Sequence, residues 1–400
     1  MKRLFQTVAK TMLMLLVIMS LLPLPTSYAQ QAGEPIIIGE KIKIHSKILN
    51  EDREIWIYRP DGYKEPHIKY PVLYLLDGDG HFHHTTGIIR FLARQNRMPE
   101  MMVVAILNTQ RTRDLTPAIQ LDTTRAFPTS GGAPNFLRFL ADELVPQIDQ
   151  SYPTSNYRML VGHSFGGLFA LHALVNRPEV FNSYIAISPS LWWDAQKPVV
   201  EAEHFLKNTK ELKGDFYMTL GNEGGRMLGG VWKLTAALEE SAPKDFHWYF
   251  NRMPKETHGS VPHRSTYDGL ETIFLDWQAP NLYEMVVKNG IEAINEHYKK
   301  LSKRYGYQIV ASEGTINVLG YNFLNRDKYD IALALFKMNT ENYPKSANTF
   351  DSMGDAYDRM GNDKLAYESY KRAYDIGKQN ADPQLNTYQN NMQRLEKKLK

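Results

Sequence analysis

The stretch LVGHSFGGLFALHAL, from Leu160 to Leu174, decides the fold. The apolar residues Tyr157–Val161 predict a short buried strand, and the leucines that follow recur at helical spacing and predict a helix. Between them, Gly162, Ser164 and Gly166 match the pattern GxSxG, in which small residues permit a sharp turn and hold the serine hydroxyl at the carboxyl end of a sheet. Any glycine-rich turn satisfies this pattern, so the rest of the chain must decide whether Ser164 is a nucleophile.

Strand-like apolar runs alternate with helical patterns, such as Asn135–Ile148, from Ile36 to about Ala279. Most of these runs are rich in Val, Ile and Leu without alternation, which predicts an α/β fold with a mostly parallel sheet covered by helices on both faces. Ligands of such sheets bind at the carboxyl ends of the strands. The expected strands are an antiparallel pair, Glu40–Leu49 and Glu54–Arg59, followed by Val72–Leu76, Met102–Leu107, Tyr157–Val161, Tyr184–Ser188, Phe216–Leu220 and Phe246–Phe250.

The first 29 residues differ from the rest of the chain. Three basic residues precede an apolar run, Met12–Leu24, and small residues follow up to Ala29. This order is typical of a secretory signal peptide and predicts cleavage after Ala29. A membrane anchor is the alternative, but the run is short and interrupted by prolines. We therefore expect a protein of the periplasm or one that is secreted.

Composition excludes several classes of function. Removal of residues 1–29 takes away three basic and no acidic residues, which leaves 44 of each sign. A neutral chain without a basic stripe argues against a nucleic-acid partner. The chain has no cysteine, which excludes disulfides and thiolate metal sites and, in an exported protein, points to a bacterial periplasm or the outside of the cell. Nothing after residue 30 is long and apolar enough to cross a membrane, so we expect no membrane association after cleavage.

Beyond Pro280 the pattern is helical, and it repeats after 34 residues. The first copy contains Leu319, Gly320, Phe323, Ala332 and Phe336, and the second contains Met353, Gly354, Tyr357, Ala366 and Tyr370. We expect two tetratricopeptide-like repeats, with flanking helices at Gly290–Tyr305 and Gln384–Leu399. The expected organisation is a signal peptide (1–29), a catalytic α/β domain (30–280) and a small all-α repeat domain (281–400).

A serine hydroxyl needs a base to remove its proton, and the base needs an acid to orient it. His258 follows the last strand and is the expected base for Ser164, with His263 as the runner-up. Glu223 lies on a glycine-rich turn after another strand and is the expected acid. Asp194, which follows the preceding strand, is the alternative acid.

Two backbone N–H groups must stabilise the oxyanion that forms during ester cleavage. The N–H of Phe165, directly after the nucleophile, is the first candidate, and the N–H of Asp79, in a loop after an early strand, is the second. A metal site is the alternative interpretation of the neighbouring cluster Asp77, Asp79, His81, His83 and His84. Because serine chemistry needs no divalent ion, we expect no metal.

Two further loops at strand ends are candidate walls of a substrate pocket. Arg111 and Arg113 follow the Met102–Leu107 strand and are suited to an anionic group. Trp192 and Trp193 follow Tyr184–Ser188 and are suited to an aromatic or sugar ring. Core packing and structural salt bridges explain these residues equally well.

An ordered set of motifs, GHSFGG, LLDGDGHF, NTQRTRDLTP, ISPSLWWD, GNEGG and ETHGS, resembles the esterase D and siderophore-esterase-like family of the α/β-hydrolases. The resemblance covers about 250 residues and is more specific than GxSxG alone. It implies an α/β-hydrolase fold with Ser164 as nucleophile, His258 as base, and Asp79 and Phe165 as oxyanion donors. The SPSLWW loop and the C-terminal repeats are most similar to the exported siderophore-esterase-like branch, in which the acid is the least uniform member.

We therefore expect an exported serine esterase that works through an acyl-enzyme without a metal or organic cofactor. The substrate is expected to be a small-molecule ester, such as a siderophore trilactone, or an oligosaccharide carrying feruloyl or acetyl groups. Acyl transfer to an acceptor other than water is a third alternative. A different class of function is a non-catalytic scaffold, and in either case the repeats offer a surface for a protein partner or for self-association.

Overall fold

The computed structural model describes residues 34–60, 69–122, 127–278 and 281–400 of the 400-residue chain. The segment expected to be a signal peptide, residues 1–29, lies outside these residues. Gly39–Lys400 form one compact unit, to which all the elements below belong.

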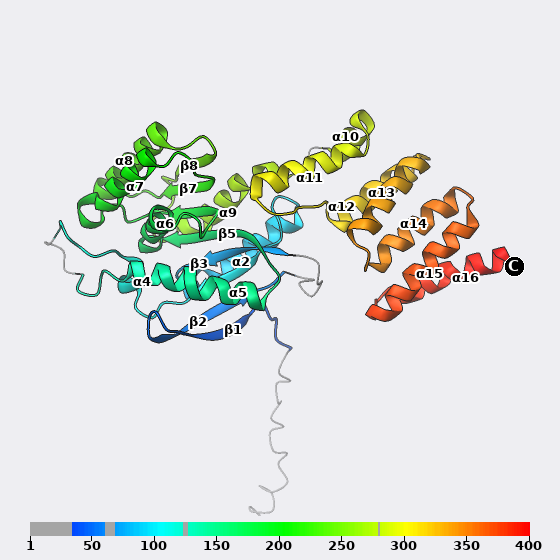
Figure 1. Ribbon diagram of the computed structural model, residues 1–400, viewed down its shortest axis with the longest axis horizontal. Coiled ribbons are helices and arrows are strands. Elements are labelled where there is room, and N and C mark those ends of the chain that lie inside the picture. Colours follow the sequence, from blue (N-terminus) through cyan, green and yellow to red (C-terminus); the bar gives the residue numbers. More distant parts are fainter. Residues whose placement is uncertain (1–33, 61–68, 123–126, 279–280) are drawn as a thin grey trace, which may run out of the picture. The chain divides into compact units, whose positions relative to one another are not determined.

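An eight-stranded sheet in the order β1-β2-β4-β3-β5-β6-β7-β8 organises the first part of this unit (Figure 1). β1 pairs antiparallel with β2, and β2 pairs antiparallel with β4, whereas all the other neighbours are parallel. The α/β class expected from the sequence is confirmed, and each predicted strand is present. The strands are β1 (Glu40–Ser46), β2 (Glu51–Tyr58), β3 (Tyr70–Leu75), β4 (Met102–Ile106), β5 (Thr154–His163), β6 (Ser183–Ile187), β7 (Gly214–Leu220) and β8 (Phe246–Arg252).

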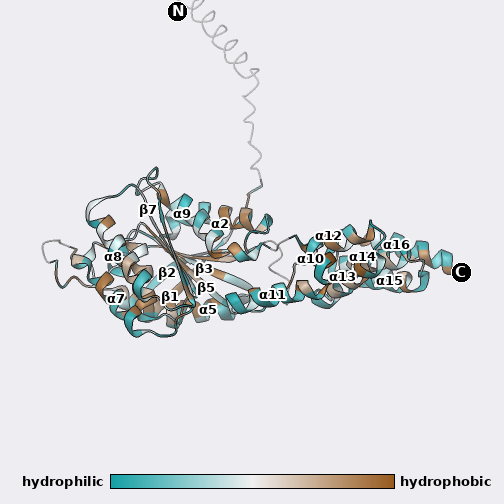
Figure 2. Cartoon of the chain, turned by 90° about the horizontal axis from the view of Figure 1, so that it is seen from above, coloured by the Kyte–Doolittle hydropathy of each residue, from teal (hydrophilic) through white to brown (hydrophobic). Residues whose placement is uncertain are grey.

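Helices cover both faces of the sheet (Figure 2). Tyr74 of β3 packs toward α4 through α8, and its neighbours Leu73 and Leu75 pack toward α2 and α9, because successive side chains of a strand point to opposite faces. All residues of β3 are buried, as the continuous apolar run predicted. The helices are α2 (Gly78–Arg94), α3 (Arg111–Leu115), α4 (Ala133–Arg138), α5 (Val145–Ser151), α6 (Phe165–Asn176), α7 (Lys197–Asn208), α8 (Gly225–Ser241) and α9 (Val261–Ile273).

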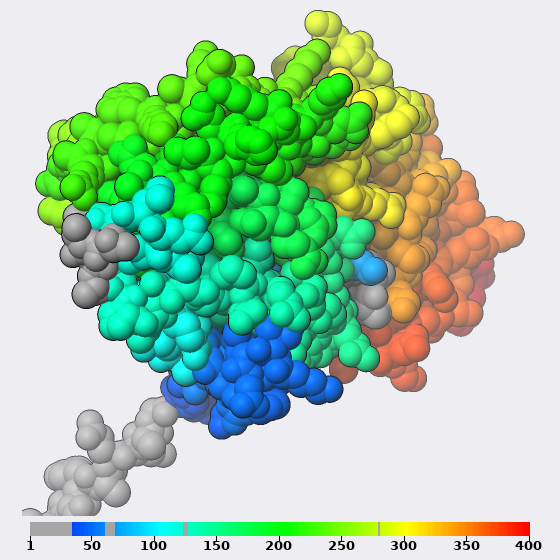
Figure 3. All heavy atoms as spheres, turned by 60° about the vertical axis from the view of Figure 1, so that its left-hand side comes forward, coloured from blue at the N-terminus to red at the C-terminus, as the bar shows by residue number. Residues whose placement is uncertain are grey.

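The predicted helix Asn135–Ile148 is not regular. Its middle, Phe139–Leu144, is π-helical and joins α4 to α5. Pro146 lies in the first turn of α5 and has no N–H to donate to the preceding turn, so the hydrogen-bond register changes there. In the space-filling view, the cyan and teal residues, which include α4 and α5, lie between the blue residues of β1 and β2 and the green residues that follow β6 (Figure 3).

The last part of the chain is entirely helical among the described residues. α12 and α13 recur 34 residues later as α14 and α15. A Cβ atom on Gly320 would lie 2.4 Å from the Phe336 ring, and one on Gly354 would lie 2.6 Å from the Tyr370 ring, so both helix pairs pack closely at a glycine. The helices are α10 (Leu282–Asn289), α11 (Glu292–Tyr305), α12 (Glu313–Leu324), α13 (Tyr329–Asn342), α14 (Ala347–Arg359), α15 (Asp363–Asn380) and α16 (Leu385–Leu399).

α11 packs against the sheet part of the unit. Arg304 forms an ion pair with Asp215, near the start of β7, and the Tyr305 hydroxyl donates to the carbonyl of Ile273 at 3.1 Å. One apolar cluster includes residues of β3 and β5 as well as residues of α11, α12 and α13. No helix among the described residues has the length and apolar character that a membrane crossing requires.

Candidate active site

The turn between β5 and α6 presents Ser164 in a strained backbone conformation, with φ 61° and ψ −113°. The N–H of Ser164 donates to the carbonyl of Ile187 at 2.9 Å, which fixes the turn to β6. A Cβ atom on Gly162 would lie 2.3 Å from the Gly166 carbonyl oxygen, so the turn requires glycine there. This is the strand-to-helix turn that GxSxG predicted.

Three side chains from separate strand ends meet at this turn. The Ser164 Oγ lies 3.0 Å from Nε2 of His258, and Nδ1 of the same imidazole lies 2.6 Å from Oε1 of Glu223. Burial raises the pKa of Glu223, but the hydrogen bond from His258 and several weaker interactions outweigh burial, so its pKa lies below its ordinary value. The carboxylate is therefore charged at neutral pH and able to stabilise an imidazolium.

The two alternative assignments occupy other positions. Asp194 is buried, and its Oδ1 accepts the backbone N–H groups of Gln120, Leu121 and Asp122. Burial raises the pKa of Asp194, and these three hydrogen bonds lower it to a net value below the ordinary one. His263 is exposed on α9, with its ring 5.4 Å from that of His84. The structure therefore places Glu223 and His258, rather than these two residues, beside Ser164.

The two candidate oxyanion donors occupy corresponding positions in the first turns of two helices. Phe165 is the first residue of α6, and Asp79 is the second residue of α2, whose N-cap is Asp77. The first N–H groups of a helix have no acceptor within that helix. Both predicted oxyanion donors are thus at helix N-termini, where the helix dipole favours negative charge.

The carboxylate of Asp77 is bound by protein side chains. It accepts a hydrogen bond from Nδ2 of Asn108 at 2.7 Å. It also accepts two hydrogen bonds from Arg111, from Nε at 2.6 Å and from Nη2 at 2.9 Å. Among the described residues no group of three or more His, Asp or Glu side chains is placed to hold a metal ion. The Asp77 carboxylate is instead engaged by Asn108 and Arg111.

Two histidines of this cluster lie on the far side of His163, whose ring packs against His258. The ring of His163 lies 4.5 Å from that of His258 and 5.8 Å from that of His81, and His81 Nδ1 lies 3.0 Å from His84 Nε2. Burial, and then the neighbouring His258, lowers the pKa of His163 to about 4. His163 is therefore neutral at physiological pH and adds no positive charge beside the base.

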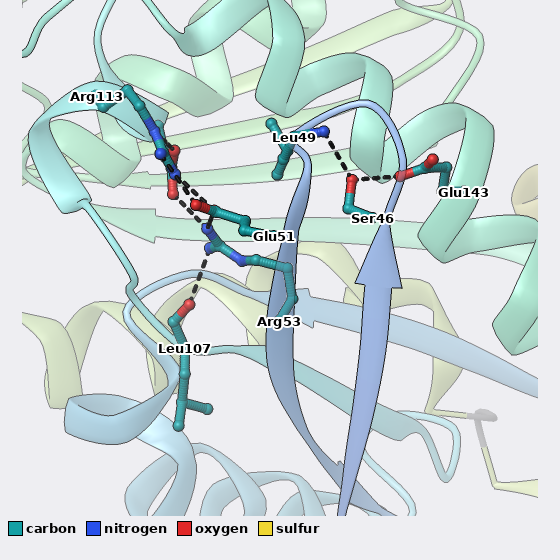
Figure 4. Close-up of polar contacts among 8 residues, drawn as sticks. Ser46, Leu49, Glu51, Arg53, Leu107, Arg113 and Glu143 are labelled. Atoms are coloured by element: carbon teal, nitrogen blue, oxygen red, sulfur yellow. Dashed lines mark hydrogen bonds and ion pairs between the residues drawn. The ribbon is translucent and has the colours of Figure 1, made fainter.

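Arg113 belongs to a structural ion cluster. Its three guanidinium nitrogens donate to Glu51 and Asp114, and Arg53 pairs with the same two carboxylates. Figure 4 shows Arg53 and Arg113 converging on Glu51, with the carbonyl of Leu107 accepting from Arg53. For Arg113 the salt-bridge alternative is correct, because its donors are already satisfied.

The paired tryptophans do not form a clamp. Trp193 is fully buried, and its indole N–H donates to the carbonyl of Pro117 at 3.2 Å. Trp192 is half-buried, with its ring 6.1 Å from those of Phe165 and Phe127. Trp192 is therefore the one member of the pair that can face a substrate near the nucleophile.

Two residues next to Ser164 and Glu223 were given no role of their own in the sequence analysis. The Ser190 hydroxyl lies 3.3 Å from Ser164 Oγ, and Arg252 Nη2 donates to the carbonyl of Glu223 at 2.7 Å. Ser190 follows β6 and Arg252 is the last residue of β8, so position at a strand end was the available signal.

Comparison with known proteins points to one group. Residues 46–227 match the model of a family described as "Putative esterase". The ferri-bacillibactin esterase BesA of Bacillus subtilis is 34% identical over 197 residues, which are 44% of this chain and 66% of BesA. The siderophore triacetylfusarinine C esterase of Aspergillus fumigatus is 36% identical over 210 residues, which are 48% of this chain and 65% of that protein. The chain thus spans less than two thirds of the length of these curated relatives.

A solved structure extends the similarity. An IroE-like serine hydrolase from Shewanella oneidensis is 29% identical with a TM-score of 0.68, and the match covers 76% of this chain and 99% of that one. The similarity therefore reaches beyond the segment that the family model covers.

Proposed function

We propose that this chain, which belongs to the esterase family of the α/β-hydrolases through its sheet domain, is a serine esterase that hydrolyses siderophore-type esters through an acyl-enzyme. The observation that carries the proposal is the continuous hydrogen-bonded array of Ser164, His258 and Glu223. Nucleophile, base and orienting acid are all within the distances that acyl transfer requires.

In the proposed first step, Ser164 Oγ bonds to the ester carbonyl carbon as its proton passes to Nε2 of His258. The N–H groups of Phe165 and Asp79 stabilise the resulting oxyanion, and Glu223 stabilises the imidazolium. The bond from the carbonyl carbon to the alcohol oxygen then breaks, and His258 gives its proton to that oxygen. In the second half of the reaction, a water molecule gives a proton to His258 as its oxygen bonds to the acyl carbon. The bond between the acyl carbon and Ser164 Oγ then breaks, and His258 returns the proton to Ser164 Oγ.

Similarity to proteins named for their action on siderophores supports that class of substrate. The half-buried Trp192, next to Phe165, offers an aromatic surface near the nucleophile. An exported enzyme follows if residues 1–29 are a cleaved signal peptide. We further propose that α12 to α15 are tetratricopeptide-like repeats and that the chain divides into a catalytic domain and a repeat domain near residue 280.

The test is hydrolysis of p-nitrophenyl butyrate and of a ferric catecholate trilactone by the wild-type chain and by Ser164→Ala. We expect Ser164→Ala to lose about 10⁴-fold or more in kcat on both substrates. Mass spectrometry of the quenched wild-type reaction should detect the butyryl group on Ser164.

Ser151→Ala is the matched control, because Ser151 is exposed at the end of α5, beside the amino-terminal end of β5. It should retain wild-type rates. Wild-type inactivity on both esters, or full activity of Ser164→Ala, would refute the proposed function. Activity on the butyrate but none on the trilactone would refute only the siderophore assignment.

A further inference from the structure

Arg111, on the short helix α3, contacts both sides of the candidate oxyanion site. Its Nε and Nη2 donate to the carboxylate of Asp77, and Nη2 also donates at 3.2 Å to the carbonyl of His163, which directly precedes the nucleophile. Its guanidinium carbon lies 5.4 Å from the centre of the Phe165 ring, which directly follows the nucleophile. One side chain thus links the loop after β3 to the turn after β5.

Asp77, the partner of Arg111 in the loop after β3, has an unfavourable backbone conformation. As the N-cap of α2 it has φ 53° and ψ 45°, in the left-handed region, and its side chain makes no capping hydrogen bond to its own helix. Asp77 is 8% exposed, and a Cβ atom on Gly166 would lie 3.4 Å from its Oδ2. A buried carboxylate needs hydrogen-bonding partners, and here Arg111 and Asn108 supply them.

The geometry of the contact requires arginine. A guanidinium presents parallel N–H groups that match the two oxygens of a carboxylate, whereas the ammonium of lysine is a point charge without this fork. A lysine in place of Arg111 can balance the charge of Asp77, but it cannot bind both oxygens and the carbonyl of His163 together.

We propose that Arg111 is a positioning residue of the esterase site, which fixes the N-terminus of α2 against the nucleophile turn and so sets the separation of the two backbone donors, Asp79 N–H and Phe165 N–H. This inference rests on the proposed function. It replaces the expectation that Arg111 binds an anionic part of the substrate, because the donors of its fork are occupied by Asp77.

Two variants and two substrates test it. Arg111→Met keeps an unbranched apolar stem and removes the guanidinium donors. We expect kcat to fall about 10²-fold with KM within about threefold, because a misplaced oxyanion donor acts on the transition state. The loss should be equal on neutral p-nitrophenyl butyrate and on the anionic ferric trilactone. Arg111→Lys should recover little of it.

Arg113→Lys is the matched control for Arg111→Lys. It replaces an arginine by lysine two residues away, at a position whose guanidinium binds Glu51 and Asp114. It should keep kcat within about twofold. A rise in KM confined to the trilactone would overturn the inference in favour of substrate binding, and a lower melting temperature with unchanged kcat would overturn it in favour of a purely structural role.

Amide hydrogen exchange separates failure of this inference from failure of the proposed function. Arg111→Met should accelerate exchange in peptides covering residues 76–82 and 163–168 and leave the others unchanged, whether or not the chain turns over esters. Unchanged exchange in both peptides would overturn the inference. An inactive wild-type chain would refute the esterase function. Accelerated exchange in these two peptides of Arg111→Met would still support the inference that Arg111 fixes α2 against the turn after β5.

Discussion

Two carboxylates that follow adjacent strands, the half-buried Glu223 and the buried Asp194, have different tasks. Glu223 binds the base, and Asp194 binds three backbone N–H groups. Glu223→Gln removes the charge that holds the imidazole in the required tautomer, so we expect kcat to fall by about 10⁴-fold with little change in melting temperature.

Asp194→Asn is the same chemical change at the other carboxylate. It should lower the melting temperature, because charge-assisted hydrogen bonds become neutral ones, and should leave kcat within about fivefold of the wild type. Steady-state kinetics and thermal unfolding of both variants check this contrast. If Asp194→Asn loses more activity than Glu223→Gln, the assignment of the acid is wrong.

The sequence predicted that Ser164, His258 and Glu223 lie together because each follows a strand end, where local motifs signal a turn. It did not predict the environments of Arg111 and Trp193. The partner of Arg111 is Asp77, and Trp193 is buried against Phe127 and donates to Pro117, all of which are distant in the chain. Burial of a loop side chain depends on such long-range contacts, which one sequence does not display.

At the level of elements, the glycines of the C-terminal helices allow close packing. Gly320 of α12 lies against the Phe336 ring of α13. Gly320→Ala adds a methyl group without room for it, and we expect it to destabilise the protein by about 1–3 kcal/mol despite the higher helix propensity of alanine. Chemical denaturation followed by circular dichroism measures the change.

Gly314→Ala, near the start of the same helix, is the control. A Cβ atom on Gly314 has nothing within 4 Å, so this variant should be neutral or stabilising by up to about 1 kcal/mol. Equal destabilisation by both substitutions would show that helix propensity, and not the contact with Phe336, is what Gly320 provides.

Strands were easier to predict than irregular helices. The apolar runs of the parallel strands are continuous because both faces are covered, and this signal is local. The π-helical turns at Phe139–Leu144 leave the apolar pattern nearly helical, so periodicity alone predicted one regular helix there.

At the scale of the molecule, the ion pair between Arg304 and Asp215 joins α11 to the sheet. Asp215 is 1% exposed, and burial raises its pKa while Arg304 lowers it, with burial the larger effect. Arg304→Met leaves the carboxylate buried without its cation, and we expect a loss of about 3–5 kcal/mol in the free energy of unfolding. Denaturant titration followed by circular dichroism and by tryptophan fluorescence tests this.

The double variant Arg304→Met with Asp215→Asn is the control, because a neutral amide costs less to bury than an unpaired carboxylate. It should regain a large part of the lost stability. No recovery in the double variant would mean that Arg304 acts by packing and not by its charge. The sequence predicted the helices on either side of this contact, but not the contact itself, since Asp215 and Arg304 are 89 residues apart.

The nucleophile turn also separates two kinds of evolutionary constraint. Gly162 is required by the fold, since any side chain there would collide with the carbonyl of Gly166, whereas Ser164 is required only by the proposed chemistry. The backbone at Ser164, with φ 61°, is itself one that glycine adopts more easily. A descendant freed from selection for hydrolysis would therefore keep Gly162 and drift toward glycine at position 164, and that exchange would mark a lineage that has kept the fold and abandoned the reaction.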